Sequence, residues 1–417
     1  MVQKDLTSVP RQDFIRHISV LCDAKWSYFF TFHLDEREFM IRPLVIHSVV
    51  AASVFAMFAI VDTAAAWKIL PEPSQTDQQV GKLDPWIKKF KNHVPEELAE
   101  NFAKAQHEQI AHRIFGCEGE DCSRPRPGLQ KSAPSAVIAG VRWNDAPPFT
   151  LLQTKTGLCP TGEVITIINY PECWGILFMD AKKQTEAEKQ YYNAPVAPVV
   201  YRSHFGDMQF LHSMAFSEKE LAGETKRKIM AWARLMYRIA LGEITRSTSI
   251  KKTGIADINS LFTSENDTIQ TFFVNDNPGE YKDDGNLHLF AIGVLIHMVS
   301  DSFVDSHVDR DKPHRQECKN VSGKHNPGTI RSFHVYNLQD SLAHSRAETD
   351  RELAYRNYDL IDVGKTIMEY YSRKAPWEEL RAYLDCVYDL ADPNAPAGPG
   401  KDYQRIDKGP VFPGGHE

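Results

Sequence analysis

Residues 287–307, LHLFAIGVLIHMVSDSFVDSH, form the stretch that decides the fold of this chain. Apolar side chains occupy nearly every face of a helix drawn through this stretch. A helix that is apolar all round is buried in the core of a protein. We therefore predict a central buried helix from Leu287 to about Asp305.

Two pairs of side chains spaced four residues apart carry the candidate chemistry. His297 and Asp301 would lie one above the other on the buried helix and could hold a cation between them, the alternative being a buried ion pair. His307 follows Asp301 by six residues and should face a different ion or leave the helix. His344 and Glu348 repeat the spacing, with a solvated helix face as the alternative. Zinc takes imidazole and carboxylate ligands in groups of three or four, so His307, His344 and Glu348 would complete one such group.

Further helices and one long irregular region are expected around this centre. Helix signals mark the ranges 95–115, 220–242, 331–350 and 358–390, the last with a break near 374–376. The stretch 136–215 has no helical period and predicts irregular structure with short strands, including 163–168 and 175–179. The expected fold is therefore an all-α domain with an inserted loop and short-strand region at about 146–200.

The N-terminal sequence predicts export. The apolar run 45–61 is short for a membrane span, and it precedes Ala64 and Ala66, the small residues that a signal peptidase requires. We interpret 40–66 as a signal peptide, with a retained membrane anchor as the alternative, and expect a secreted or periplasmic protein. The predicted organisation is a mis-assigned upstream segment 1–39, the signal peptide 40–66, a catalytic domain 67–390 and a loosely ordered Pro- and Gly-rich tail 391–417.

The cysteines agree with export. The chain has seven, and removing the predicted signal peptide with the segment before it deletes only Cys22, which leaves 7 − 1 = 6. An even number fits disulfides formed in an oxidising compartment. We expect the pairs Cys117–Cys122 and Cys159–Cys173, the alternative being unpaired thiols.

The composition and net charge of the chain indicate which classes of substrate to expect. The chain is 42% hydrophobic and 25% charged, which is typical of a globular protein. Its formal net charge of −7 provides no broad basic field for a polyanion. A small or lipid phosphodiester is therefore a better first expectation than a nucleic acid.

The spaced motifs resemble the pattern of the zinc-dependent phospholipase C superfamily, which also includes single-strand-specific nucleases. That pattern, His-x3-Asp-x5-His followed by His-x3-Glu, is present here as His297, Asp301, His307, His344 and Glu348. The resemblance implies a helical fold, about three zinc ions and the hydrolysis of a phosphodiester.

Segments upstream resemble the same superfamily: Trp143-Asn144-Asp145, the stretch 203–207 (SHFGD), the stretch 107–111 (HEQIA), and Trp67, which cleavage would make the N-terminal residue. The resemblance implies three sets of zinc ligands, namely Trp67, His107 and Asp301; Asp145, His204, His297 and Asp301; and His307, His344 and Glu348. It implies catalytic roles for Asp301, which would bridge two ions, and for Asp145, which could also orient the attacking water.

The chain departs from the superfamily at Ser300 and Asp305, where Gly and Pro are usual, and in a longer stretch between Trp67 and His107. Four other side chains could replace an assigned ligand: His112, Asp207, His212 and His288. Three aromatic side chains could line a lipid pocket or belong to the core: Trp143, Phe205 and Phe210.

The function that the resemblance favours is a phospholipase C acting on phosphatidylcholine-like lipids at a membrane surface, which yields diacylglycerol and a phosphorylated head group. We prefer it to a secreted single-strand nuclease because of the acidic balance, and because Phe303 stands where the nuclease branch often has another His. No nucleic-acid partner is expected in this interpretation, and the oligomeric state is left open. An acid phosphatase and a secreted metal-binding protein without catalysis are the remaining alternatives.

Overall fold

The computed structural model describes residues 105–405, except for 120–121, 124, 127, 152–158, 168–169, 189–198, 275–283, 312–315 and 349–357. The described residues belong to a single compact unit of the chain. Several predicted features lie outside them: the upstream segment 1–39, the signal peptide 40–66, Trp67, the start of the helix predicted from residue 95, and the end of the tail, 406–417.

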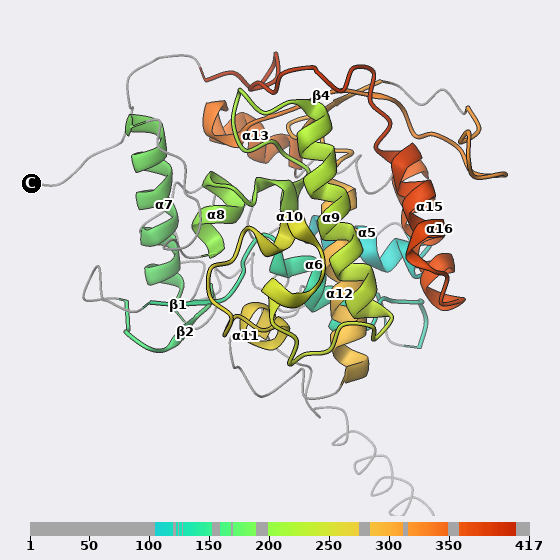
Figure 1. Cartoon of the computed structure of the whole chain (residues 1–417), viewed down its shortest axis with the longest axis horizontal. Coiled ribbons are helices and arrows are strands. Elements are labelled where there is room, and N and C mark those ends of the chain that lie inside the picture. The colour runs from blue at the N-terminus through green and yellow to red at the C-terminus, as the bar shows by residue number, and fades with distance from the viewer. Residues whose placement is uncertain are drawn as a thin grey trace, which may run out of the picture. The chain divides into compact units, whose positions relative to one another are not determined.

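The described part of the chain is predominantly helical (Figure 1), as expected from the sequence. Its α-helices are α5 (Gln106–Ile114), α6 (Ser135–Trp143), α7 (Pro171–Glu188), α8 (Val199–Phe205), α9 (Ala222–Ala240), α10 (Ala256–Asn259), α11 (Ile269–Val274), α12 (Asp284–Asp301), α13 (Ser341–Glu348), α15 (Tyr358–Ser372) and α16 (Trp377–Val387). Short 3-10 helices are η1 (Gln209–His212), η2 (Ile250–Lys252) and η3 (Tyr336–Leu338). Two small antiparallel sheets pair β1 (Phe149–Thr150) with β2 (Val164–Ile165), and β3 (Val308–Arg310) with β4 (Ile330–Phe333).

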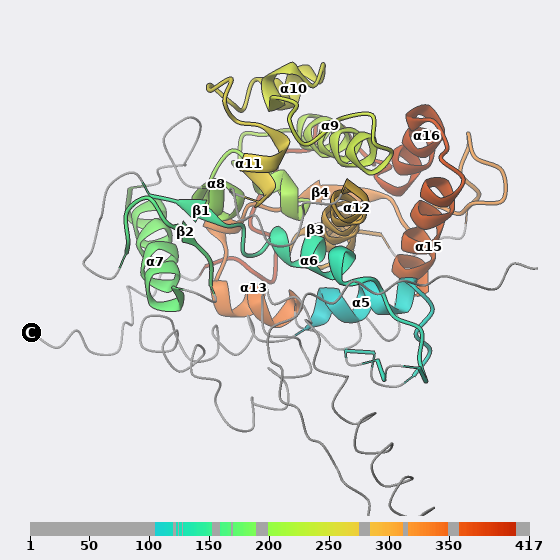
Figure 2. The ribbon, with the colours of Figure 1, turned by 90° about the horizontal axis from the view of Figure 1, so that it is seen from below.

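The α12 helix is the central element, as predicted, and every residue from Phe290 to Asp301 is buried. It packs against α6 and α9 (Figure 2). Gly140 of α6 and Gly293 of α12 permit a close approach of the two backbones, since a Cβ at Gly140 would lie 2.0 Å from the carbonyl oxygen of Phe290. This approach brings the end of α6 beside the imidazole-bearing turn of α12.

The end of α12 decides where the next candidate ligand lies. The helix ends at Asp301 rather than near Asp305. Tight turns follow, in which the amide of Phe303 donates to the carbonyl of Ser300. His307 therefore leaves the helix, which is one of the two outcomes predicted for it.

The region 136–215 contains more helix than predicted. Helices α6, α7 and α8 all lie in it, and the strand predicted at 175–179 is wrong because those residues lie inside α7. Within α7, the buried apolar positions 174, 177, 178 and 181 follow a helical period. Of the strand predicted at 163–168, residues 163–167 are described, and within them β2 is the stretch that forms a strand.

The helix predicted at 331–350 is wrong in its first half. Residues 330–333 form β4, which pairs with β3 through contacts such as Val308 with Phe333. Burial of both side chains in the core stabilises this pairing over the local helical preference. In the described part of this range, the helical segments are the short 3-10 helix η3 and the α-helix α13.

The C-terminal segment is more ordered than its composition suggests. In the described residues 391–405, the carbonyl of Gly398 accepts from the amide of Val335 at 2.8 Å, and that of Pro399 accepts from the side chain of Gln339 at 2.6 Å. The helices predicted at 220–242 and 358–390 are present as α9 and as α15 with α16, and the predicted break between the last two contains Lys374 at φ 52°.

Three disulfides join described residues. Cys117–Cys122 and Cys159–Cys173 are the two predicted pairs, and Cys318–Cys386 is the third. Their presence fits an oxidising compartment. Among the described residues, no helix has the length and apolar character needed to cross a membrane.

Candidate metal centre

Nine side chains suited to binding metal converge near the end of α12. They are supplied by α5, α8, η1, α12, α13 and the loops that follow α6 and α12. They form three groups, in each of which the candidate ligand atoms lie within 4.8 Å of one another: His107, His297 and Asp301; Asp145, His204 and His212; and His307, His344 and Glu348.

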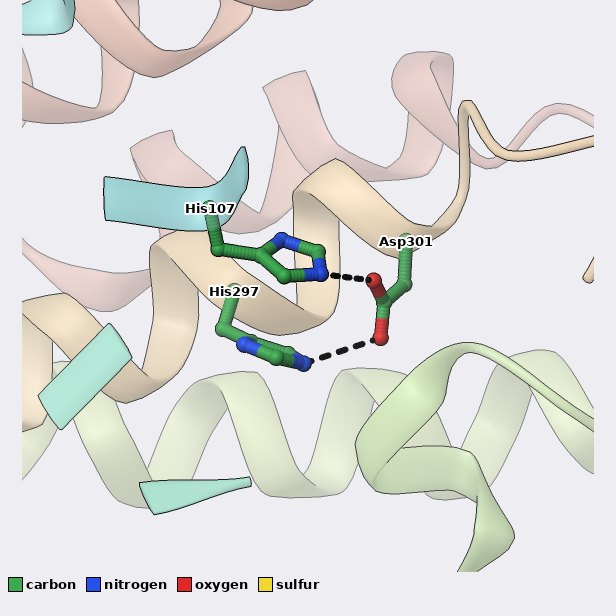
Figure 3. Close-up of side chains that lie close together, drawn as sticks. All are labelled: His107, His297 and Asp301. Carbon is green, nitrogen blue, oxygen red and sulfur yellow. Dashed lines mark ion pairs between the residues drawn. The ribbon is translucent and has the colours of Figure 1, made fainter. Parts of the chain in front are cut away.

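Asp301 is fully buried and connects the groups. As Figure 3 shows, its two oxygens face different imidazoles: Oδ1 lies 3.3 Å from Nε2 of His107, and Oδ2 lies 3.1 Å from Nε2 of His297. These two rings are stacked with centroids 4.0 Å apart. His212 and His307 also approach Oδ2 through Nδ1, at 3.0 and 3.7 Å. Four imidazoles thus surround one carboxylate, more than its charge alone requires.

The group formed by His307, His344 and Glu348 has the spacing of a metal site. The Nε2 atoms of the two imidazoles lie 3.3 Å apart, and each lies 3.0 Å from Oε1 of Glu348. Zinc–nitrogen bonds of about 2.0–2.1 Å place tetrahedral ligands about 3.3 Å from one another. These three atoms therefore match one face of a tetrahedral zinc site.

Five imidazoles of the centre share one orientation, in which Nδ1 is hydrogen-bonded to a protein oxygen and Nε2 remains available to bind a metal ion. The oxygen partners of Nδ1 are the carbonyl of Val141 for His297 (2.5 Å), that of His212 for His307 (2.8 Å), the amide oxygen of Gln339 for His344 (2.6 Å) and the hydroxyl of Ser300 for His107 (2.9 Å). For His204 they are the carbonyl of Val200 (3.1 Å) and the hydroxyl of Ser203 (2.9 Å). Metal-binding histidines almost always donate their other ring N–H in this way.

Gln339 fixes the orientation of His344. Its Nε2 donates to the carbonyls of Ser306 and Pro399, both at 2.6 Å, so its Oε1 must face His344 and accept from Nδ1. Neutral His344 therefore has a lone pair on Nε2, and so does neutral His307, whose Nδ1 donates to a backbone carbonyl. These lone pairs and a carboxylate oxygen point at one another, an arrangement that requires a cation or an added proton.

Burial and neighbouring charges shift the pKa values of the residues of the centre in different directions. Burial lowers the pKa of His107 to about 4 and that of His204 to about 3, which keeps both imidazoles neutral, as metal ligands must be. Burial also disfavours a charge on His297, but Asp301 and Asp145 outweigh it and raise its pKa to about 9. Desolvation, with Asp301 nearby, raises the pKa of Asp145 to about 7.

Two buried atoms of the centre lack a hydrogen-bond partner among the described residues: Oδ1 of Asp301 and Nε2 of His212. An unsatisfied buried polar atom costs about 1–3 kcal/mol. Both atoms are of the kinds that zinc prefers, carboxylate oxygen and imidazole nitrogen. The residues of the centre therefore fit bound divalent cations.

The centre is open to solvent on one side. The side chains of Asp145 and Glu348 are 37% and 28% exposed, whereas those of His297 and Asp301 are completely buried. A buried aromatic ring packs against one imidazole of the centre, since Tyr336 lies 4.5 Å from His344 between ring centroids. A ligand would approach from the side of Asp145 and Glu348.

The structure brings together all of the sequence-predicted ligands that it describes. These are His107, Asp145, His204, His297, Asp301, His307, His344 and Glu348, whereas Trp67 lies outside the described residues. His212 also joins the centre, although the sequence analysis gave it only as a possible replacement. It lies in a short 3-10 helix, where no regular spacing relates it to the other ligands.

The other candidate replacements lie outside the three groups. His112 accepts a hydrogen bond from the amide of Ala133 at 3.0 Å, and Asp207 pairs with Arg202 at 2.8 Å. His288 lies beside Gly242. Of the aromatic candidates, Trp143 and Phe210 belong to the main core, while Phe205 packs beside the centre against Tyr336, at 5.5 Å between ring centroids.

Fold and site together define a helical, disulfide-containing protein with a candidate centre for about three metal ions. No protein-family model, curated protein or solved structure gives a significant match to the chain.

Proposed function

We propose that the chain is a secreted, zinc-dependent phosphodiesterase, and specifically a phospholipase C that acts on phosphatidylcholine-like lipids. The observation that supports it best is the grouping of nine imidazole and carboxylate side chains into three sets around Asp301, with one side open to solvent. Zinc is the proposed metal because the donors are nitrogen and carboxylate oxygen, and because His307, His344 and Glu348 have tetrahedral spacing. The resemblance of the spaced motifs to the phospholipase C superfamily supplies the reaction.

Charge favours a phosphate ester as the ligand. Three divalent ions would carry six positive charges, and the carboxylates of Asp145, Asp301 and Glu348 would offset three of them. A loaded centre would thus retain 6 − 3 = 3 positive charges in a largely desolvated site, where electrostatic attraction is stronger than in water. A phosphodiester anion at the open side would compensate part of this charge.

Bound zinc would polarise the phosphoryl group, and it would lower the pKa of a water molecule enough for that water to lose a proton near neutral pH. The chain's own residues would position the reactants. Asp145 is the most exposed carboxylate of the centre and lies 3.5 Å from Nε2 of His297, so it can orient the attacking water and accept its proton. Buried Asp301 would fix the positions of the imidazoles that it contacts.

The phospholipid substrate remains preferred over single-stranded DNA. The chain is acidic overall, which disfavours a long polyanion. The stretch 107–111 (HEQIA) resembles the first-helix motif of the nuclease branch of the superfamily, but its Glu108 has a structural explanation here, because it is buried and pairs with Arg142 at 2.6 Å. Nuclease activity is therefore kept as an outcome of the test.

The test uses purified protein with a measured zinc content, offered phosphatidylcholine vesicles, sphingomyelin vesicles and single-stranded DNA in parallel. We expect release of phosphocholine from phosphatidylcholine, loss of release with a chelator and recovery with zinc. Asp301→Asn should be inactive. His112→Gln, which alters a buried imidazole outside the three groups, should remain active.

The other outcomes are equally informative. Cleavage of DNA without release of phosphocholine would make the protein a nuclease of the same superfamily. Stoichiometric zinc without hydrolysis of any substrate would leave a metal-binding protein. Absence of bound transition metal in active protein would contradict the whole proposal.

A further inference from the structure

His212 differs from the other five imidazoles of the centre in what its Nδ1 contacts. That atom lies 3.0 Å from Oδ2 of Asp301, and also 3.4 Å from Nε2 of His297 and 3.9 Å from Oδ1 of Asp145, so its nearest acceptor is a carboxylate. Its Nε2 is buried and has no hydrogen-bond partner among the described residues. The side chain is only 6% exposed, so bulk solvent does not replace the missing partner.

The residue after His212 holds it in place. Ser213 has a left-handed backbone, with φ at 51°, which is uncommon for a residue with a Cβ. Its hydroxyl donates to the carbonyl of Met298 at 2.6 Å and lies 2.9 Å from the hydroxyl of Tyr388. Such a backbone persists only where its surroundings determine it. The fold therefore fixes the imidazole of His212 beside Asp301.

The orientation of His212 distinguishes its two nitrogens. If Nδ1 bound the metal, the hydrogen would be on Nε2, which has no acceptor in the described structure. If Nδ1 donates to Asp301, the lone pair of Nε2 is free. The second arrangement leaves no buried N–H unsatisfied, and it is the arrangement of a ligating imidazole oriented by a carboxylate.

We propose that His212 is a metal ligand through Nε2, sharing one ion with Asp145 and His204, and that Asp301 is its hydrogen-bond acceptor. The inference rests on the metal centre proposed above and is independent of the substrate. One ring nitrogen of His212 lies within 4.8 Å of the ligand atoms of Asp145 and His204. The proposal accounts for the unpaired Nε2, because the ion takes its lone pair.

The same arrangement accounts for Oδ1 of Asp301, the other atom that lacks a hydrogen bond among the described residues. With Oδ2 of Asp301 accepting from His212, Oδ1 is free to bind the ion shared with His107 and His297. Each of the three ions then has three protein ligands. Catalytic zinc sites have this number, with a further position open. The resemblance implies instead that Asp301 binds two ions directly and that His297 serves the second.

Two substitutions at His212 separate a ligand from a hydrogen-bond donor. In His212→Asn the amide lies near the position of Nδ1 and can still donate to Asp301, but no atom replaces Nε2. In His212→Gln the amide reaches the position of Nε2, and the bond to Asp301 is lost. His112→Asn is the matched control, because His112 is equally buried and lies outside the three groups.

The measurement is the number of zinc ions per chain in zinc buffers of stated free concentration, with circular dichroism to establish folding. We expect His212→Asn to lose one ion, or to bind it at least tenfold more weakly, with the other two unchanged. The control should bind as the wild type does. A folded His212→Asn with three ions at wild-type affinity would overturn the inference, and so would a loss confined to His212→Gln.

A measurement on the wild type avoids dependence on any variant. In protein loaded with cadmium-113 and labelled with nitrogen-15 histidine, a ligating ring nitrogen is coupled to cadmium. We expect six coupled imidazoles, with Nε2 as the coupled atom of His212. Five coupled imidazoles, with His212 uncoupled, would overturn the inference and leave the metal centre intact. Wild-type protein that binds no metal would instead contradict the centre itself.

Discussion

Substituting Gln339 tests whether the C-terminal segment supports one metal site and not the others. Gln339 is 1% exposed, and its amide joins the carbonyls of Ser306 and Pro399 to Nδ1 of His344. Gln339→Ala removes all three hydrogen bonds. His344 can then rotate, and the segment that contains Pro399 loses one of its attachments.

The magnitude follows from these contacts. Loss of the group that orients a ligating imidazole typically weakens metal binding about 10- to 100-fold, or about 1.4–2.7 kcal/mol. The folded protein should also lose about 2–4 kcal/mol, since the Pro399 carbonyl loses this bond and the side chain leaves a small cavity. The Ser306 carbonyl retains a donor, Nδ1 of His334 at 3.1 Å, and adds little to this cost.

The assay is competition for zinc against a chelator of known affinity, which resolves the three sites by their dissociation constants. We expect one site to weaken by the stated factor and two to remain unchanged. Gln209→Ala is the matched control: Gln209 is also 1% exposed, and its side chain bonds the backbone at Gly206, Phe216 and Tyr336, without touching an imidazole of the centre. Equal weakening in both variants, or wild-type binding by Gln339→Ala, would refute the reasoning.

Three further outcomes are expected. Asp301→Asn should reduce the zinc content by about two ions and Glu348→Gln by about one, as metal analysis will measure, because Asp301 would bind one ion and orient His212, a ligand of a second, whereas Glu348 would serve one. Replacing Cys318 and Cys386 by Ser should lower the free energy of unfolding by about 4 kcal/mol in urea titrations, because that disulfide closes a loop of 68 residues. Burial lowers the pKa of His112 in the folded protein to about 4. As the pH falls, the unfolded state therefore takes up a proton on this residue first, and the free energy of unfolding should decrease between pH 6.5 and 4. His112→Gln should remove up to about 3 kcal/mol of this decrease, as urea titrations at both pH values will measure.

The central helix and the ligands on it could be predicted because their signals are local. An apolar run with His297 and Asp301 on one face requires only the helical period, and the structure contains this buried helix, although it ends at Asp301 rather than near Asp305. The pairing of Cys117 with Cys122 was local in the same sense, with a separation of 5 residues. The helix break containing Lys374 was marked by the following Pro376.

The remainder depended on contacts between distant segments. The helix α6 has no strong amphipathic period, and its place is set by close contact of Gly140 with Gly293 of α12. The strand β4 depends on pairing with β3 across the segment that separates them. His212 lies in a short 3-10 helix that is followed by Ser213 in a left-handed backbone conformation, for which the sequence gives no signal.

The sequence leaves open whether the residues of the centre form a buried ion pair, which needs a proton, or a metal site. The geometry of the centre bears on this choice. In the group of His307, His344 and Glu348, Asp301 and Glu348 outweigh burial and raise the pKa of His307, so one proton can join its Nε2 to Glu348. Burial lowers the pKa of His344, whose Nε2 lone pair still lies 3.0 Å from the same carboxylate oxygen. One proton therefore relieves one contact and leaves the other repulsive. A divalent cation bound to all three atoms would relieve both, which is why the geometry favours metal.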